Sequence, residues 1–211
     1  MKSLRILGLA ILFLGLMSPL AMGQRVADYN IVRDWSSEYN PYGVWSCGYK
    51  TDWSTPFALD AVAGSNWPGI SGWWPSIVGD QPEIRHNDTK KKICGQTWCV
   101  PTNYIAMHPG PNGEFSVLRW TAPATGLYGL HVLYEGLDWS FPTSSTFSVV
   151  HDSNGVLIKT QVGNYGQRSA FNPRPMKLAK GETLDFMVGW GMDGNYYGDS
   201  TGVAVRIWKL R

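Results

Sequence analysis

Two stretches of this sequence combine aromatic rings with amide side chains, and that combination is typical of sites that recognise sugars. A sugar presents apolar C–H faces edged by hydroxyl groups, so a flat ring packs on the face while amides bind the edge. The residues predicted to bind such a ligand are Asn66, Trp67, Trp73 and Trp74 in the first stretch, and Asn195, Tyr196 and Tyr197 in the second. Because most tryptophans are largely buried, the alternative for each Trp is that it caps the end of a core.

Two aspartates raise the question of a structural calcium ion. Asp34 near the start and Asp199 before the last apolar run supply oxygen ligands of the kind that calcium binds. A jelly roll brings the two ends of its chain together, which makes this pairing geometrically reasonable. The alternative is that each aspartate caps a turn, which is the commoner role.

The sequence gives little support for catalysis. It has 4 histidines but no HExxH or HxxE pattern. Two carboxylates could serve as the acid and nucleophile of a glycoside hydrolase, but the sequence alone cannot pair them. We therefore predict a non-catalytic binding module whose partner is a neutral polysaccharide or a cell-surface glycan. The alternatives are a structural or adhesive matrix protein and a glycan hydrolase.

The first residues indicate export. Lys2 and Arg5 precede the apolar run Ile6–Met17, and Ala21-Met22-Gly23 follows as a cleavage site, so residues 1–23 are predicted to be a signal peptide. The run is shorter than the ~20 residues that cross a bilayer, which argues against an uncleaved anchor. Residues 24–211 are then a single secreted domain, extracellular or periplasmic, with no membrane insertion.

Charge narrows the choice of partner. The chain has 18 basic and 16 acidic residues, and removal of Lys2 and Arg5 leaves a mature net charge near zero. A neutral chain has no electrostatic reason to bind nucleic acid or an anionic membrane surface.

Export also bears on the 3 cysteines. Cys94 and Cys99 enclose Gly-Gln-Thr-Trp, a turn-like spacing, and in an oxidising compartment a disulfide is the default. We predict that this pair bridges a hairpin. Two thiols without a second pair do not make a zinc site. Cys47 is then either a buried free thiol or a link to another chain.

The elements that must position these residues are strands. Short runs of β-branched and aromatic residues recur between Gly, Pro, Asn and Asp. The clearest are Phe115–Trp120, Leu127–Tyr134, Thr146–His151, Val156–Gln161, Thr183–Trp190 and Gly202–Trp208. Asn154-Gly155 between two such runs is a strong hairpin signal. The pattern predicts an all-β fold, an antiparallel β-sandwich of the jelly-roll type.

The N-terminal half has a different pattern. Residues 40–101 look loop-rich, with short strands expected at Tyr29–Trp35, Gly43–Lys50 and Ile93–Val100. In the strand Phe115–Trp120, Arg119 lies on the face opposite Leu118 and Trp120, so we expect a paired or stacked arginine with a structural role.

Three motifs carry a family resemblance. They are Asp34-Trp35-Ser36 with Asn40–Gly48, His108-Pro109-Gly110-Pro111 with Leu118–Pro123, and Asp199-Ser200-Thr201. Together they resemble a group of secreted bacterial proteins of undefined function, many of which end in a PEP-CTERM sorting signal. The resemblance covers Asp34 to Trp208 and implies a sandwich of the galactose-binding or carbohydrate-binding-module type. It supplies no catalytic residues and no ligand.

The sequence departs from that family pattern in two places. Cys47 stands where the family pattern has tyrosine, and the chain ends at Arg211 without a Pro-Glu-Pro tail. If the relatives are anchored by such a tail, we expect this protein to be released instead.

Overall fold

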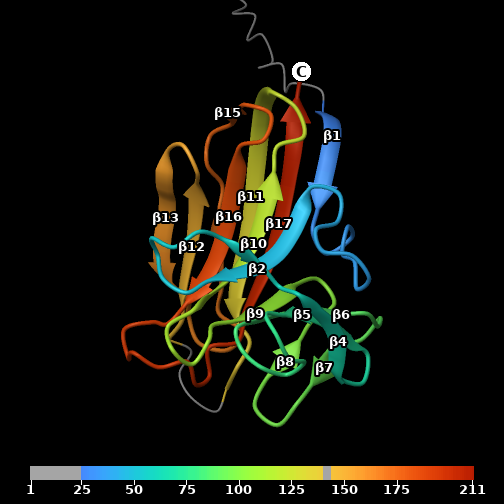
Figure 1. The fold of residues 1–211 in the computed structure, drawn as a ribbon, viewed down its shortest axis with the longest axis vertical. Coiled ribbons are helices and arrows are strands. Elements are labelled where there is room, and N and C mark those ends of the chain that lie inside the picture. Colours follow the sequence, from blue (N-terminus) through green and yellow to red (C-terminus); the bar gives the residue numbers. More distant parts are fainter. Residues whose placement is uncertain (1–24, 140–143) are drawn as a thin grey trace, which may run out of the picture.

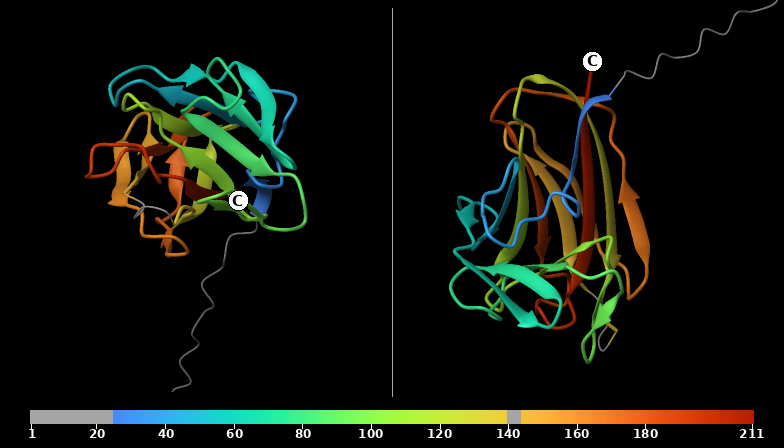
Figure 2. Two further views of the ribbon diagram at one scale, coloured as in Figure 1. Left: turned by 90° about the horizontal axis from the view of Figure 1, so that it is seen from below. Right: turned by 90° about the vertical axis from the view of Figure 1, so that its right-hand side faces the viewer.

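The molecule is built from strands in two facing sheets (Figures 1 and 2). The computed structural model describes residues 25–139 and 144–211, and within them there are strands and turns but no helix. Every pairing between named strands is antiparallel. The predicted all-β antiparallel sandwich is therefore confirmed. The predicted signal peptide lies outside the described residues, which hold no helix with the length and apolar character to traverse a bilayer.

The smaller sheet has six strands. In spatial order they are β13 (Gly155–Gln161), β12 (Thr146–His151), β16 (Thr183–Gly189), β10 (Phe115–Thr121), β2 (Trp45–Lys50) and β3 (Ala58–Leu59). β12 and β13 form the hairpin predicted from Asn154-Gly155, and Gly155 adopts a left-handed φ of 73°. A residue without Cβ takes this backbone conformation at no steric cost.

The larger sheet has nine strands. Its main path runs through β14 (Arg168–Phe171), β11 (Gly126–Gly136), β17 (Thr201–Leu210), β9 (Ile105–His108), β6 (Glu83–Asn87), β5 (Ile70–Trp74) and β4 (Val62–Trp67). Two strands lie off this path: β1 (Arg25–Asn30) pairs with β17, and β15 (Met176–Leu178) pairs with β11.

One edge of β17 is shared by two strands. β1 pairs with Arg206 to Leu210, whereas β9 pairs with Thr201 to Val203. The four strands β9, β6, β5 and β4 therefore extend the sheet from only one end of β17, at the lower right of Figure 1, and we call these four strands the lobe.

A single hydrophobic cluster fills the space between the sheets. Large aromatic side chains form its centre, with Tyr134 stacked on Phe147 (ring centroids 4.6 Å apart) and Trp120 meeting Tyr128 edge-on (5.1 Å). The lobe adds Trp73, Ile84, Ile105 and Met107 to the same cluster. Each fully buried side chain of this size contributes about 1.5–3 kcal/mol, so the inner face of the lobe is held by the same interactions as the sandwich.

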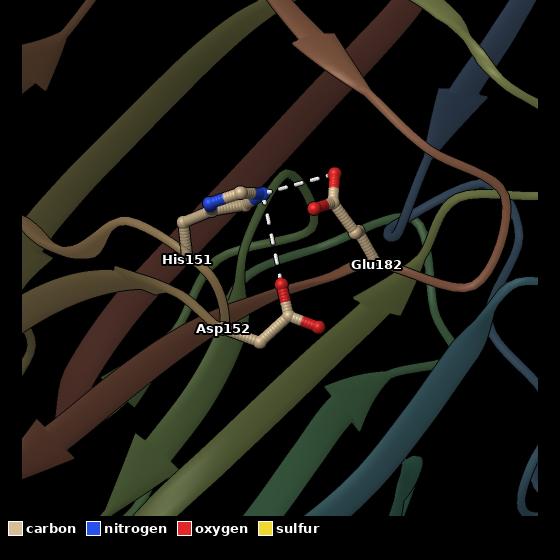
Figure 3. A group of neighbouring side chains, drawn as sticks. All are labelled: His151, Asp152 and Glu182. Carbon is tan, nitrogen blue, oxygen red and sulfur yellow. Dashed lines mark ion pairs between the residues drawn. The ribbon is translucent and has the colours of Figure 1, made fainter.

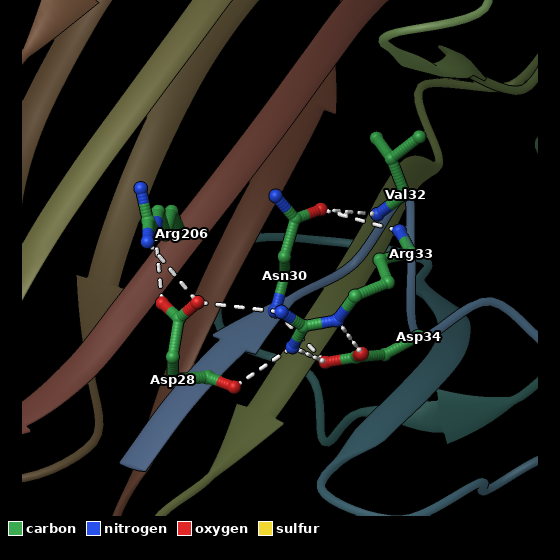
Figure 4. A network of polar contacts seen from close by, with 6 residues as sticks. All are labelled: Asp28, Asn30, Val32, Arg33, Asp34 and Arg206. Carbon is green, nitrogen blue, oxygen red and sulfur yellow. Dashed lines mark hydrogen bonds and ion pairs between the residues drawn. The ribbon is translucent and has the colours of Figure 1, made fainter. Parts of the chain in front are cut away.

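Two of the expected strands are wrong. The first strand ends at Asn30 instead of continuing to Trp35, because the Asn30 side chain accepts hydrogen bonds from the backbone N–H groups of Val32 and Arg33 and closes a turn (Figure 4). Ile93–Val100 is a hairpin of β7 (Ile93–Cys94) and β8 (Cys99–Val100) rather than one strand.

The cysteines behave as the sequence indicated. Cys94 and Cys99 form the predicted disulfide across the β7–β8 hairpin. Cys47 is a free thiol that is 5 % exposed, and burial raises its pKa well above the ordinary value. Burial of the thiol favours the buried free thiol over a link to another chain.

Candidate ligand-binding pocket

A pocket of about 530 Å³ opens on the outer face of the lobe. On β6, Ile84 points into the sandwich core, so its neighbours Glu83 and Arg85 point to the opposite face and line the pocket. His108 on β9 pairs directly with Glu83 across the strands and lies on the same face. The walls come from the β7–β8 hairpin and from the loop that precedes β17.

The pocket joins the two aromatic stretches that the sequence singled out. Asn66 and Trp67 at the end of β4 line one side, and Tyr196 and Tyr197 line another. Trp67 is 39 % exposed and Tyr197 is 62 % exposed, so both rings are accessible at the rim. Residues far apart in the sequence thus form one aromatic border around a hollow.

Three of the predicted residues do not line the pocket. Trp73 is buried in the sandwich core, where its indole N–H donates to the Ser36 carbonyl, and Trp74 is fully buried. Asn195 does not line the pocket but accepts a hydrogen bond from the Tyr197 backbone N–H. For Trp73 and Trp74 the expectation that the side chain faces a ligand is wrong, because both complete the packing, whereas for Asn195 it stays a prediction.

The floor of the pocket is a buried ion pair. Arg85 Nε lies 3.1 Å from Glu83 Oε1, and both side chains are about 5 % exposed or less. Trp74 donates to Glu83 Oε2 at 3.0 Å, and the Arg85 guanidinium lies 4.5 Å from the centre of the Trp98 ring. Burial raises the pKa of Glu83, and the neighbouring Arg85 opposes that shift.

Arg85 has more donors than acceptors around it. Its Nε meets no acceptor with hydrogen-bond geometry, and among residues 25–139 and 144–211 Glu83 is the one carboxylate that pairs with it. A buried N–H without an acceptor is costly, since the missing bond forfeits the interaction that water would have supplied. Arg85 also lines the pocket, so its guanidinium is placed to donate to a group inside it.

His108 is the complementary acceptor. Its Nδ1 lies 2.8 Å from the Pro109 carbonyl oxygen, which only accepts, so Nδ1 carries the proton and Nε2 is left with a lone pair. Burial lowers the pKa of His108 to about 4, with Arg85 adding to the shift, so the ring is neutral at physiological pH. Tyr196 holds the ring edge-on at 5.9 Å.

The floor therefore combines a donor-only and an acceptor-only side chain. Arg85 can only donate and neutral His108 can only accept at Nε2, so the ligand group suited to both is one that accepts and donates, which is a hydroxyl. Glu83 and Asp138 both line the pocket, and their negative charge opposes an anionic ligand. Sequence reasoning missed Glu83, Arg85 and His108; the one available signal was the charged pair flanking apolar Ile84 in Glu-Ile-Arg.

The predicted calcium pair is wrong. The carboxylate of Asp34 accepts from the Asn30 backbone N–H at 2.8 Å (Figure 4), and Asn30 faces Arg206, whereas Asp199 precedes the first residue of β17. A strand rises about 3.3 Å per residue, so these levels are roughly 20 Å apart. Asp34 caps the turn after β1, which is the alternative role considered for it.

One cluster in the described residues brings three metal-binding side chain types together. His151 Nε2 lies 3.6 Å from Asp152 Oδ1 and 3.5 Å from Glu182 Oε2 (Figure 3). However, the Asn154 backbone N–H donates to His151 Nδ1 at 3.0 Å, so the proton of the neutral ring lies on Nε2. A metal needs the lone pair of Nε2, and the arrangement instead directs an N–H at two carboxylates.

Comparison with known proteins gives only distant likenesses. No protein family and no curated protein matches the sequence. Similar solved structures include the C-terminal CBM6 of LamC, a marine laminarinase from Zobellia galactanivorans (15% identity, 50% of this chain and 80% of that chain, TM-score 0.30). A CBM51 from Clostridium perfringens GH95 in complex with methyl-galactose is another (15% identity, 70% and 92%, TM-score 0.37). A third is the Podospora anserina GH26-CBM35 β-(1,4)-mannanase (12% identity, 72% and 26%, TM-score 0.33).

These neighbours are carbohydrate-binding modules or proteins that contain one. At such identities and TM-scores, neither a ligand nor a binding residue is transferred to this chain. The resemblance to PEP-CTERM-tailed proteins stays a prediction, since no family matches.

Proposed function

We propose that this protein binds a neutral saccharide in the pocket on the outer face of the lobe. The ligand ring packs against the exposed faces of Trp67 and Tyr197, and a hydroxyl group takes the N–H groups of Arg85 while donating to His108. We propose further that the chain is exported, as Lys2, Arg5 and the apolar run Ile6–Met17 indicate.

One observation carries the proposal. The buried guanidinium of Arg85 lines a hollow with an aromatic rim, and its Nε lacks a hydrogen-bond acceptor among the described residues. Proteins keep buried charges paired and hydrogen-bonded. The Arg85 guanidinium is held in place by Glu83 and Trp98 and lies beside a hollow, which fits a binding site better than a packing defect.

The test is a binding measurement on residues 24–211. A printed array of neutral and acidic glycans identifies a binder, and isothermal titration calorimetry then compares the wild-type protein with Trp67→Ala, Tyr197→Ala and Arg85→Lys. Loss of one stacked ring removes about 1.4 kcal/mol, which weakens binding about tenfold. Arg85→Lys keeps the charge but not the planar set of donors, and we expect a similar loss.

Tyr39→Ala is the matched control, because Tyr39 is 62 % exposed and does not line this pocket. The proposal fails if the array retains no protein, or if the rim variants bind as tightly as the wild-type protein and Tyr39→Ala. Preference for acidic over neutral glycans would contradict the neutral ligand class.

A glycan hydrolase is the second candidate, because two carboxylates, Glu83 and Asp138, line the same pocket. The raised pKa of Glu83 suits a general acid, although both of its oxygens are already engaged by Arg85 and Trp74. Incubation of a bound oligosaccharide with the protein distinguishes the two functions: new reducing ends that disappear with Glu83→Gln indicate hydrolysis, and intact ligand indicates binding alone.

A further inference from the structure

The β7–β8 hairpin carries part of the pocket wall but belongs to neither main sheet. Thr97 and Trp98, in the turn of the hairpin, both line the pocket. The hairpin is a two-stranded sheet with only two residue pairs, Ile93 with Val100 and Cys94 with Cys99. So short a hairpin is not stable by itself in water, and its shape depends on what holds it.

Trp98 is a wall residue that contacts the floor directly. Its ring lies 4.5 Å from the Arg85 guanidinium and meets Trp67 edge-on at 5.5 Å. The ring also lies against Gly95, where a Cβ would come within 2.5 Å of Trp98 Cε2. Gly95 directly follows Cys94. The arm of the hairpin that packs against Trp98 is therefore tied to the other arm by the disulfide.

The two arms of the hairpin are anchored unequally. On the Cys99 arm, Cys99 donates from its backbone N–H to the Leu137 carbonyl at 3.0 Å, and the Val100 carbonyl accepts from Asn87. On the Cys94 arm, Ile93 packs against the small cluster that contains Ile70, and beyond Cys94 the tie is within the hairpin itself, where the Gly95 N–H donates to the Trp98 carbonyl at 2.9 Å. Cys94 is exposed and Cys99 is buried, so opening the bridge releases the exposed arm.

We infer that the Cys94–Cys99 disulfide fixes Trp98 over Arg85, so that the pocket binds its ligand in the oxidised form and loses affinity when the bridge is reduced. This inference rests on the proposed saccharide binding. A dithiol reductant supplies two electrons and two protons: its thiolate attacks the exposed Cys94 sulfur, the S–S bond breaks, and two cysteine thiols and a cyclic disulfide result. In the reduced form the freed arm must become ordered each time a ligand binds, and this loss of conformational entropy weakens binding.

The experiment compares three proteins, all in a Cys47→Ala background so that one thiol pair is present. They are the parent, Cys94→Ser/Cys99→Ser, and Trp98→Ala, each titrated with the glycan identified by the array, with and without dithiothreitol. Reduction is expected to weaken binding by the parent about tenfold. The serine variant should match the reduced parent in both conditions, and Trp98→Ala should bind weakly in both.

A second measurement needs no ligand. Hydrogen exchange of residues 93–100 should speed up on reduction of the parent while β10, β16 and β17 keep their protection, which shows that the hairpin loosens and the sandwich stays folded. Equal affinity of the oxidised and reduced parent, or unchanged exchange in the hairpin, overturns the inference. Absence of glycan binding by the oxidised parent overturns the proposed function instead, and the exchange result then still decides whether the bridge controls the wall.

Discussion

At the residue scale, buried ionisable side chains set how this molecule responds to pH. Asp60 is 3 % exposed, its Oδ1 has no hydrogen-bond partner among the described residues, and burial raises its pKa to about 8. Asp199 is fully buried and its pKa rises to about 7, mainly from burial. His108 shifts the other way, to about 4. The folded protein therefore favours neutral forms of all three.

Asp60 allows the first stability prediction. Its pKa is raised from 3.8 to about 8, so its stabilising effect is complete below pH 3.8 and is lost as pH rises through 8. Across that window the free energy of unfolding should fall by about 1.4 kcal/mol per pH unit from this group. Urea denaturation from pH 5 to 9 should show a shallower slope for Asp60→Asn, whereas exposed Asp80→Asn should keep the wild-type slope. Equal slopes in all three proteins would contradict the prediction.

The pocket residues show how far residue-level sequence reading goes. The types Asn, Trp and Tyr identified Asn66, Trp67, Tyr196 and Tyr197 because rings and amides suit a hydroxyl-rich ligand whatever the fold. Glu83, Arg85 and His108 could not be identified, since a polar or charged residue is solvated by default and only the covering hairpin and the loop before β17 make these buried.

At the element scale, strands whose apolar residues alternate in the sequence were predictable and strands without that alternation were not. In β10, β11 and β12 one set of alternate side chains enters the core, and in β16 large apolar residues still alternate although all but Thr183 are buried, so the period of two located each strand to within a few residues. In β5, β6 and β9 nearly every residue is buried, because the sandwich covers one face and the hairpin, with the loop before β17, covers the other. Alternation vanishes there, and Gly and Trp made the segment look like loops.

The β10–β16 pairing carries a further prediction. Arg119 binds Asp185 through Nε and Nη2 at 2.7 and 2.8 Å and lies 4.1 Å from the Phe57 ring centre, which confirms the paired and stacked arginine predicted from the sequence. Asp185 is 5 % exposed, so Arg119→Met should leave a buried carboxylate without its partner and lower the free energy of unfolding by about 3 kcal/mol.

Urea denaturation at pH 7 measures this loss. Arg119→Lys is the matched comparison and should lose less, since it keeps a charge for Asp185. A loss below about 0.5 kcal/mol for Arg119→Met would contradict the prediction, because the Arg119–Asp185 pair would then contribute no more to the free energy of unfolding than an exposed ion pair does.

At the scale of the whole molecule, the lobe is joined to the sandwich more by packing than by hydrogen bonds. β9 pairs with β17 at only three positions, Thr201 to Val203. The inner faces of the lobe strands, by contrast, place Trp73, Ile84, Ile105 and Met107 in the cluster that fills the sandwich. Since that cluster is continuous across both parts, we expect the lobe and the sandwich to unfold together.

Ile84→Ala tests this expectation. Ile84 is fully buried at the centre of the lobe, and removing its side chain should lower the free energy of unfolding by about 2–5 kcal/mol. Far-UV circular dichroism follows the sheets, and hydrogen exchange of β4, β5, β6 and β9 follows the lobe. The circular dichroism transition should shift to lower urea and exchange should speed up in the lobe and in β10, β11 and β17 alike, while Ile77→Ala, at a position that is 63 % exposed, should change neither. If exchange sped up in the lobe strands alone, the lobe would unfold on its own, and the prediction of one domain over residues 24–211 would fail.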